Sequence, residues 1–266
     1  MIDGQSSPSV PPHQRIAVAH DWLCGVRGGE HVLERICTLV EREFKPAGLF
    51  TMFDDRADNV PTVNAWRRRG LIRTSRLNPL VRALPGTRRW MLPLYPSCVR
   101  HLSAQLAAQH ARTPIDLVIS SSSAAIKGLR PPPHIPHLCI CFSPARYVWG
   151  DGSEYRADGT ASGRLRSLGL ALLGGRFRAW DRRTASHVSH FIAISHHIQS
   201  RIHAAYNADS TIISPPVRTN YFTPDPTVPR EDFWLFVGAL EPYKRVDLAV
   251  AAARQKHPDR IRLRRS

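Results

Sequence analysis

Short apolar segments alternate with amphipathic segments along most of this chain. The first, RIAVAH at 15–20, has the length and composition of a buried parallel strand and runs into a polar, glycine-rich turn. From Gly29 the apolar residues take helical spacing, with a stripe from Val32 to Phe44 and charged residues opposite. The opening of the chain therefore predicts a strand, a glycine turn and a helix.

The same alternation continues to about residue 214. Further strands are predicted at 48–53, 115–120, 137–142, 190–195 and 210–214. Helical stretches separate several of them and lie around 88–111, 164–186 and 196–206. This order predicts an α/β protein with a Rossmann-like, doubly wound parallel sheet.

The regular pattern breaks in a proline-rich segment at 215–232, which is typical of a linker between domains. A strand at 233–240 and a helix from Val246 then repeat the opening of a Rossmann unit, with room for about one more strand. We therefore expect four parts, namely a flexible leader (1–14), a complete first domain (15–214), the linker (215–232) and the truncated start of a second domain (233–266). Because one strand and one helix cannot cover both faces of a sheet, that start is expected to be poorly stable unless it packs on something else.

The composition is that of a folded, basic protein. Hydrophobic residues make up 42% and charged residues 22%, and 37 basic against 21 acidic side chains give a net charge of +16. This balance favours anionic partners such as phosphate-bearing substrates, an acidic membrane surface or nucleic acid, although genomic base bias produces the same excess of arginine. The amino terminus lacks the apolar centre of a signal peptide, and the longest apolar run, 168–175, is too short to span a bilayer. We expect a cytoplasmic protein, with peripheral attachment to the inner face of the cell membrane as a further possibility.

The cysteine pattern argues against a disulfide framework and against a metal site. The five cysteines are odd in number and lie mostly in apolar surroundings, namely Cys24, Cys37, Cys98, Cys139 and Cys141. Reduced, buried thiols are the expected state. The last two share one strand face without a second pair, so no metal ligands are expected.

Two glycine-containing turns between a strand and a helix are candidate phosphate sites. In GVRGGE (25–30), glycines let the backbone approach a ligand, and the N–H groups and dipole of the helix start favour an anion. In GALEPYKRVD (238–247), Lys244 and Arg245 are placed to bring positive charge to a diphosphate. A tight turn without a ligand, and a solvated lysine at a helix start, are the alternatives.

Polar residues at the end of the first strand are candidates for substrate contact. His20 and Asp21 face the cleft that is expected at the carboxyl ends of the parallel strands, where they are placed to contact a hydroxyl of an acceptor substrate. A structural histidine would give the same pattern.

A stretch at 66–90 interleaves arginine with tryptophan, leucine and isoleucine. Basic side chains attract anionic headgroups by about 1 kcal/mol each, and tryptophan suits the membrane interface. The predicted membrane surface comprises Trp66, Arg67, Arg68, Arg69 and Trp90. A solvated basic face is the alternative, and nucleic-acid binding lacks a supporting motif, so no nucleic acid is expected.

Six ordered segments resemble the bacterial family 4 glycosyltransferases, particularly the mannosyltransferase-like group. They are HDWLCGVRGGEHVLERI, SSSAAIKGL, CFSPARYVWG, FIAISHHIQSRI, PPVRTNYF and FVGALEPYKRVDLAVAAA. The resemblance covers residues 15 to about 257 and implies a GT-B fold, with an acceptor on the first Rossmann domain and a nucleotide-sugar such as GDP-mannose mainly on the second. It also implies retention at the anomeric carbon, a glycan or lipid-linked acceptor, and neither a metal nor a cofactor.

The resemblance assigns roles to individual residues. Gly28 and Gly29 correspond to the loop near the donor diphosphate, and Lys244, with Arg245 beside it, corresponds to the phosphate-binding lysine. On the acceptor side, the matching residues are Arg146, Tyr147 and Ser195.

The sequence also departs from the family pattern. Phe142 stands where the family normally has a histidine near the transferred sugar, and Ala239 stands where many relatives have an arginine. The acidic region with which the family binds its donor would lie beyond residue 266. We therefore expect a hexosyl transferase that is impaired by truncation, with a non-catalytic subunit that binds an acceptor or docks on a membrane as the alternative.

Overall fold

The computed structural model contains two compact units, residues 1–216 and 217–266. It describes residues 14–26, 28–56, 60–84, 86–150, 161–229, 231–238, 244–256 and 261–264, without the side chains of residues 89, 161–171, 256, 261, 263 and 264.

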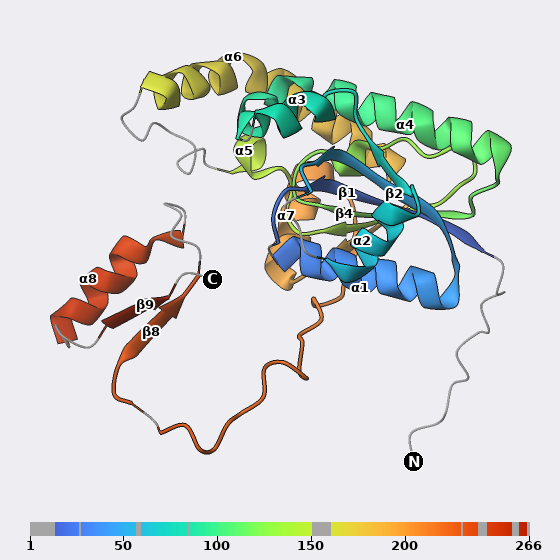
Figure 1. Cartoon of the computed structure of the whole chain (residues 1–266). Helices are drawn as coiled ribbons and strands as arrows, with labels where there is room; N and C mark the ends of the chain where they lie inside the picture. Colours follow the sequence, from blue (N-terminus) through green and yellow to red (C-terminus); the bar gives the residue numbers. More distant parts are fainter. Residues whose placement is uncertain are drawn as a thin grey trace. The chain divides into compact units, whose positions relative to one another are not determined.

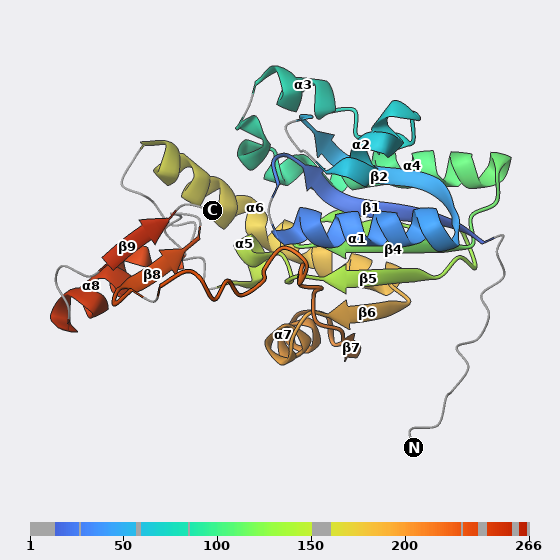
Figure 2. The same cartoon turned by 60° about the horizontal axis from the view of Figure 1, so that its bottom comes forward.

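A seven-stranded sheet forms the centre of the first unit. Its strands are β1 (Arg15–Leu23), β2 (Lys45–Asp54), β3 (Ile72–Thr74), β4 (Leu117–Ser122), β5 (His137–Cys141), β6 (His190–Ala193) and β7 (Ser210–Ile212). Every pairing is parallel, and the order is β3-β2-β1-β4-β5-β6-β7 (Figure 2). The chain winds outward from β1 to one edge and then returns to the other side, so the topological switch lies between β1 and β4. The predicted Rossmann-like, doubly wound α/β fold is confirmed.

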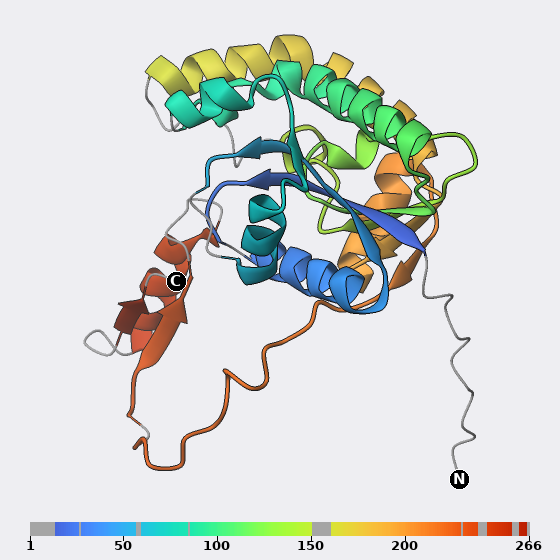
Figure 3. The ribbon, with the colours of Figure 1, turned by 45° about the vertical axis from the view of Figure 1, so that its right-hand side comes forward.

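Helices cover both faces of this sheet. The longer ones are α1 (Gly28–Glu43), α2 (Pro61–Arg68), α4 (Tyr95–Arg112), α6 (Ala161–Thr184) and α7 (His196–Tyr206). The short ones are α3 (Asn78–Ala83), α5 (Arg146–Trp149), η1 (Thr87–Trp90), η2 (Leu92–Leu94), η3 (Ile126–Gly128) and η5 (Ala185–His187). Figure 3 shows α1 and α2 on one side of the sheet and α4 and α6 on the other. This is the layered arrangement that a parallel sheet needs, because both of its faces are apolar.

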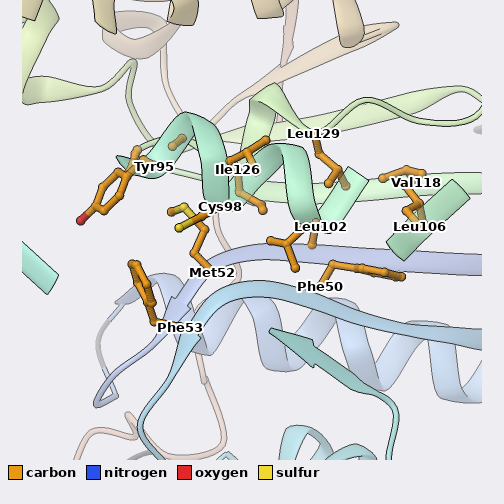
Figure 4. Packing of buried hydrophobic residues seen from close by; sticks show 14 of the residues in the cluster. Phe50, Met52, Phe53, Tyr95, Cys98, Leu102, Leu106, Val118, Ile126 and Leu129 are labelled. Carbon is orange, nitrogen blue, oxygen red and sulfur yellow. The ribbon is translucent and has the colours of Figure 1, made fainter. Parts of the chain in front are cut away.

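The larger part of the core lies between α4 and the sheet. In α4 the buried side chains recur at helical spacing, and Figure 4 shows them facing β2; the two sets are Tyr95, Cys98, Leu102 and Leu106, and Phe50, Met52 and Phe53. Leu102, Leu106 and Phe50 have no exposed surface. On the opposite face, α1 packs Leu33 and Val40 into a second cluster.

The structure contains short elements that the sequence pattern did not predict. β3, α2 and α3 were not predicted, because each has at most eight residues and little periodicity. The helix predicted at 88–111 begins at Tyr95 instead, and two 3-10 turns precede it. Pro93 and Pro96 lie at this junction, and a proline inside an α-helix removes a hydrogen bond, so the continuous helix starts late.

The second unit contains a two-stranded parallel sheet and one described helix. These are β8 (Trp234–Val237), β9 (Ile261–Arg264) and α8 (Val246–Lys256) (Figure 1). Trp234, Leu235 and Val237 are 55–57% exposed. Two strands and one helix therefore leave apolar side chains in contact with solvent.

A buried ion pair ties four elements of the first unit together. Lys127, next to β4 on η3, lies 3.1 Å from the Asp181 carboxylate of α6, and the two side chains are 2% and 0% exposed. The other Asp181 oxygen accepts hydrogen bonds from the Trp149 indole of α5 at 2.7 Å and the Tyr206 hydroxyl of α7 at 2.9 Å. Burial, with Asp181 beside it, raises the pKa of Tyr206 well above its usual value, so its hydroxyl keeps its proton.

Loss of the Asp181 carboxylate is expected to destabilise the protein strongly. Asp181→Ala leaves the Lys127 ammonium buried without its counter-ion, which costs about 3–5 kcal/mol in the free energy of unfolding. Urea denaturation measures this loss. Glu43→Ala is the matched control, because it removes one member of the exposed Arg42–Glu43 pair and is expected to cost about 1 kcal/mol or less. Equal effects of the two substitutions would contradict the structural role of the buried pair.

Candidate functional site

The predicted site residues of the first unit lie in the carboxyl-terminal half of β1 or in the segments that follow β1, β5 and β6. In parallel strands the carboxyl ends lie at one edge of the sheet, which Figure 2 shows for β1, β4, β5 and β6. Open α/β sheets bind ligands outside this edge, at the point where the strand order reverses. That point falls beside His20 at the end of β1 and Ser121 at the end of β4.

His20 is buried and is held by the neighbouring strand. Its Nδ1 lies 2.8 Å from Ser121 Oγ and 3.1 Å from the Ser121 carbonyl oxygen. Because the carbonyl oxygen can only accept, a hydrogen bond to it places a proton on Nδ1. The other ring nitrogen, Nε2, lies 4.0 Å from Glu30 Oε1 at the start of α1, and the two pair as ions when Nε2 is protonated as well.

Glu30 was missed by the sequence reasoning, although it ends the GVRGGE segment. Its side chain is 4% exposed and lies in the first turn of α1. A carboxylate is favourable there because the amino end of a helix carries partial positive charge. The pattern that could have identified it is an acidic residue in the first turn, directly after two glycines.

The two glycines at the start of α1 have different surroundings. A Cβ added to Gly29 would lie 3.3 Å from the Phe142 ring and 3.7 Å from the His20 ring, whereas a Cβ on Gly28 would meet nothing within 4 Å. Gly29 therefore permits close packing of α1 against β1 and β5. Gly28 is exposed, so its side of the helix start is open to a ligand. The first N–H groups of a helix have no partner within the helix, and an anion is the natural ligand for them.

Phe142 makes one side of the glycine turn apolar. It directly follows β5, its backbone N–H donates to the Ser122 carbonyl oxygen at 2.8 Å, and its ring lies against Gly29. The position that the resemblance associates with a histidine thus lies beside the glycine turn, and here it carries no hydrogen-bonding group.

The structure assigns Asp21 a different task from the predicted contact with an acceptor. The side chain is 1% exposed. Its two oxygens accept hydrogen bonds from the backbone N–H groups of four successive residues, 123 to 126, at 2.6–3.0 Å. This carboxylate fixes the loop between β4 and η3, and its oxygens are already used by the backbone.

The remaining acceptor-side residues line the same edge. Arg146 opens α5 and is half-buried, and Tyr147 packs its ring 5.5 Å from that of Phe177 and 6.5 Å from that of Tyr95. Ser195 caps α7, where its hydroxyl oxygen accepts a hydrogen bond from the Ile198 N–H at 3.3 Å. Direct contact of these three residues with an acceptor stays a prediction.

The predicted donor residues of the second unit are exposed. Lys244 precedes α8, and Arg245 pairs with Asp247 at 2.9 Å. The hydrogen bonds that Arg245 donates to the Asp247 carboxylate raise the pKa of Arg245 further, so its charge is fixed. The sharing of one diphosphate between Gly28 and Lys244 stays a prediction, and Ala239 lies outside the described residues.

The predicted membrane surface is corrected in two places. Trp66 is fully buried, and its indole donates to Glu41 at 2.7 Å. Arg67 forms a bidentate ion pair with Asp54, with Nη2 2.9 Å from Oδ1 and Nε 3.0 Å from Oδ2. Its side chain is 16% exposed. The amphipathic helix α2 turns these residues inward, which a reading of composition alone does not reveal.

The other members of that predicted surface are exposed. Arg69 pairs with Glu41 at 2.7 Å on the surface, while Arg68 and Trp90 are also exposed. No helix in the described part of the chain is both long and apolar enough to cross a bilayer.

The cysteines are all free thiols, and four of the five are buried. Burial raises the pKa of Cys139 to about 12, so this thiol stays protonated. Within the described ranges, no three His, Cys, Asp or Glu side chains are grouped so that they could hold a metal ion.

No protein-family model and no curated protein matches this chain. Similar solved structures include the lipopolysaccharide outer core galactosyltransferase WaaB in its apo form, at 17% identity and a TM-score of 0.49, over 95% of this chain and 60% of that one. The calicheamicin glycosyltransferase CalG4 is similar at 13% identity and a TM-score of 0.49, over 96% of this chain and 66% of that one. A ugt transferase from Siraitia grosvenorii in complex with UDP has 10% identity and a TM-score of 0.44, over 94% and 62%. The chain thus spans less than two thirds of the length of each of these structures.

The contrast between the two glycines predicts unequal responses to one substitution. Gly29→Val is expected to destabilise the protein by about 1–3 kcal/mol more than Gly28→Val, because only the former crowds the Phe142 and His20 rings. Thermal unfolding of the two variants measures the difference. Adding Phe142→Ala to Gly29→Val is expected to recover part of the loss, and no recovery would refute the contact.

Proposed function

We propose that this chain is a glycosyltransferase polypeptide that binds a nucleotide-sugar at the carboxyl edge of its first unit. The observation that carries the proposal is the open amino end of α1 at Gly28, at the topological switch and next to the buried group of His20, Glu30 and Ser121. The six sequence segments that resemble family 4 glycosyltransferases support it independently.

The proposed chemistry uses the helix start as an anion site. Glycosyl transfer with retention requires stabilisation of the departing diphosphate as the glycosidic bond breaks. Backbone N–H groups at Gly28 and Gly29 are suited to this task, because they present fixed donors and the positive end of the α1 dipole. The resemblance also assigns phosphate binding to Lys244 in the second unit.

His20 is proposed to position a sugar hydroxyl through its Nε2. Its Nδ1 is already bonded to Ser121, whereas Nε2 lies 4.0 Å from Glu30 Oε1, which is too long for a hydrogen bond. The bond to Ser121 fixes the orientation of the ring, which favours a directed hydrogen bond from Nε2 over a mobile contact.

The finer assignment rests on the resemblance alone. We propose a hexosyl donor of the mannosyl type, such as GDP-mannose, and a lipid-linked or surface polysaccharide acceptor. Retention would proceed without a metal or a cofactor.

Binding of a nucleoside diphosphate tests the site. Titration calorimetry is expected to show tighter binding of GDP or UDP than of the corresponding monophosphate. Gly28→Asp is expected to weaken diphosphate binding at least about tenfold, because its carboxylate repels the phosphate, while Gly28→Ala has little effect. An acidic residue at a helix start stabilises the helix, so the loss would not reflect unfolding. Equal affinity of Gly28→Asp and the unchanged protein would refute the proposed site.

A turnover assay distinguishes a catalytic glycosyltransferase from a non-catalytic binding subunit. Incubation with a panel of nucleotide-sugars, followed by chromatography for released nucleoside diphosphate, is expected to show release that is weaker in His20→Ala. Diphosphate binding without any release would instead support the non-catalytic alternative.

A further inference from the structure

A long stretch of the first unit carries only positive charge. Residues 59–115 contain no Asp or Glu and ten arginines, namely Arg67, Arg68, Arg69, Arg73, Arg76, Arg82, Arg88, Arg89, Arg100 and Arg112. Two of the first three are paired with carboxylates from outside the stretch, Arg67 with Asp54 and Arg69 with Glu41. Arg73, Arg76 and Arg82 are exposed further along. The centre of the stretch therefore exposes arginines and contains no acidic residue of its own.

The same part of the chain exposes large apolar side chains. Leu80, Leu84, Trp90 and Leu94 are 46–53% exposed and fall within fifteen residues, on α3, η1, η2 and the turns that join them. The other exposed large apolar residues described in the first unit are scattered along the chain, at Val26, Leu39, Leu172 and Ile213. We define the α3–η2 surface as Arg73, Arg76 and Arg82 together with Leu80, Leu84, Trp90 and Leu94.

The α3–η2 surface belongs to the same edge of the sheet as the candidate site. The chain enters α3 from the carboxyl end of β3, and the Asn78 side chain accepts a hydrogen bond from the Asp54 N–H, at the end of β2, at 2.7 Å. The Arg88 guanidinium lies 4.3 Å from the centre of the Trp22 ring, two residues beyond His20 on β1. A partner held here would therefore lie beside the proposed sugar site.

We infer that the α3–η2 surface docks the protein on an anionic lipid bilayer. Arginines attract acidic headgroups, while leucine and tryptophan side chains gain by entering the interface between headgroups and acyl chains. A nucleic-acid backbone would satisfy the arginines but offers exposed leucines nothing in return, so the combination favours lipid. Trp66 and Arg67, which the sequence assigned to a membrane surface, are not part of the α3–η2 surface, whose residues are exposed. Docking through this surface does not depend on which nucleotide-sugar is bound.

Vesicle co-sedimentation of the full chain tests this assignment. Binding is expected to vesicles that contain phosphatidylglycerol and to be much weaker with phosphatidylcholine alone. Each arginine near an anionic surface contributes about a fivefold gain in partitioning, so Arg76→Gln with Arg82→Gln is expected to lower the partition coefficient roughly 25-fold. Leu80→Ser with Leu84→Ser is expected to lower it about tenfold or more.

The matched control is Leu39→Ser with Arg42→Gln. Leu39 is 46% exposed, as Leu80 is, but both control residues lie on α1, against the other face of the sheet. The control is expected to bind vesicles like the unchanged protein, and circular dichroism checks that every variant is folded.

Three results would overturn the inference. They are equal binding to neutral and anionic vesicles, an equal loss in the α1 control, and binding of a DNA duplex through these residues while vesicles are not bound. Nucleoside diphosphate affinity is measured separately on the same variants, so failure of lipid docking and failure of the proposed function are distinguishable.

Discussion

The Asp21 carboxylate is the contact on which the rest of this edge depends. It lies at the end of β1 and accepts backbone hydrogen bonds from four successive residues of the segment after β4. These are the two neighbouring strands at which the strand order of the sheet reverses. A buried carboxylate that receives four N–H groups fixes both the strand ends and the loop, because each donor would otherwise lack a partner away from water.

The loop that Asp21 holds is linked to more distant elements. It continues directly into η3, where Lys127 pairs with Asp181 in the buried group that also contains Trp149 and Tyr206. One ion pair and two hydrogen bonds therefore connect this loop to α5, α6 and α7. On the other face of β1, the adjacent His20 points toward α1 and meets the glycine turn. Successive residues of a strand face opposite sides of the sheet. Asp21 therefore holds the loop after β4 on one face, while His20 belongs to the candidate site on the other.

Local features of this fold could be predicted from the sequence, whereas features set by distant partners could not. The other strands of the first unit and α1 were predicted, unlike β3, because apolar periodicity and the glycine turn are local signals. The role of Asp21 was not, because its partners are backbone groups more than 100 residues away, and a carboxylate bound by backbone has no sequence pattern of its own. Trp66 was misplaced for a similar reason, since the Glu41 carboxylate that receives its indole N–H lies on a different helix. The Gly29–Phe142 contact joins two segments that are far apart in sequence, and only the sheet order places them together.

The glycine turn at the start of α1 is proposed to be an anion site for a sugar diphosphate. Amide proton and nitrogen spectra of the full chain, recorded while a nucleoside diphosphate is added, test this site directly. The largest saturable shifts are expected at the amides of Gly28, Gly29 and Glu30, with smaller ones at Ser121. Saturation with shifts confined to the opposite edge of the sheet, or to the second unit alone, would contradict it.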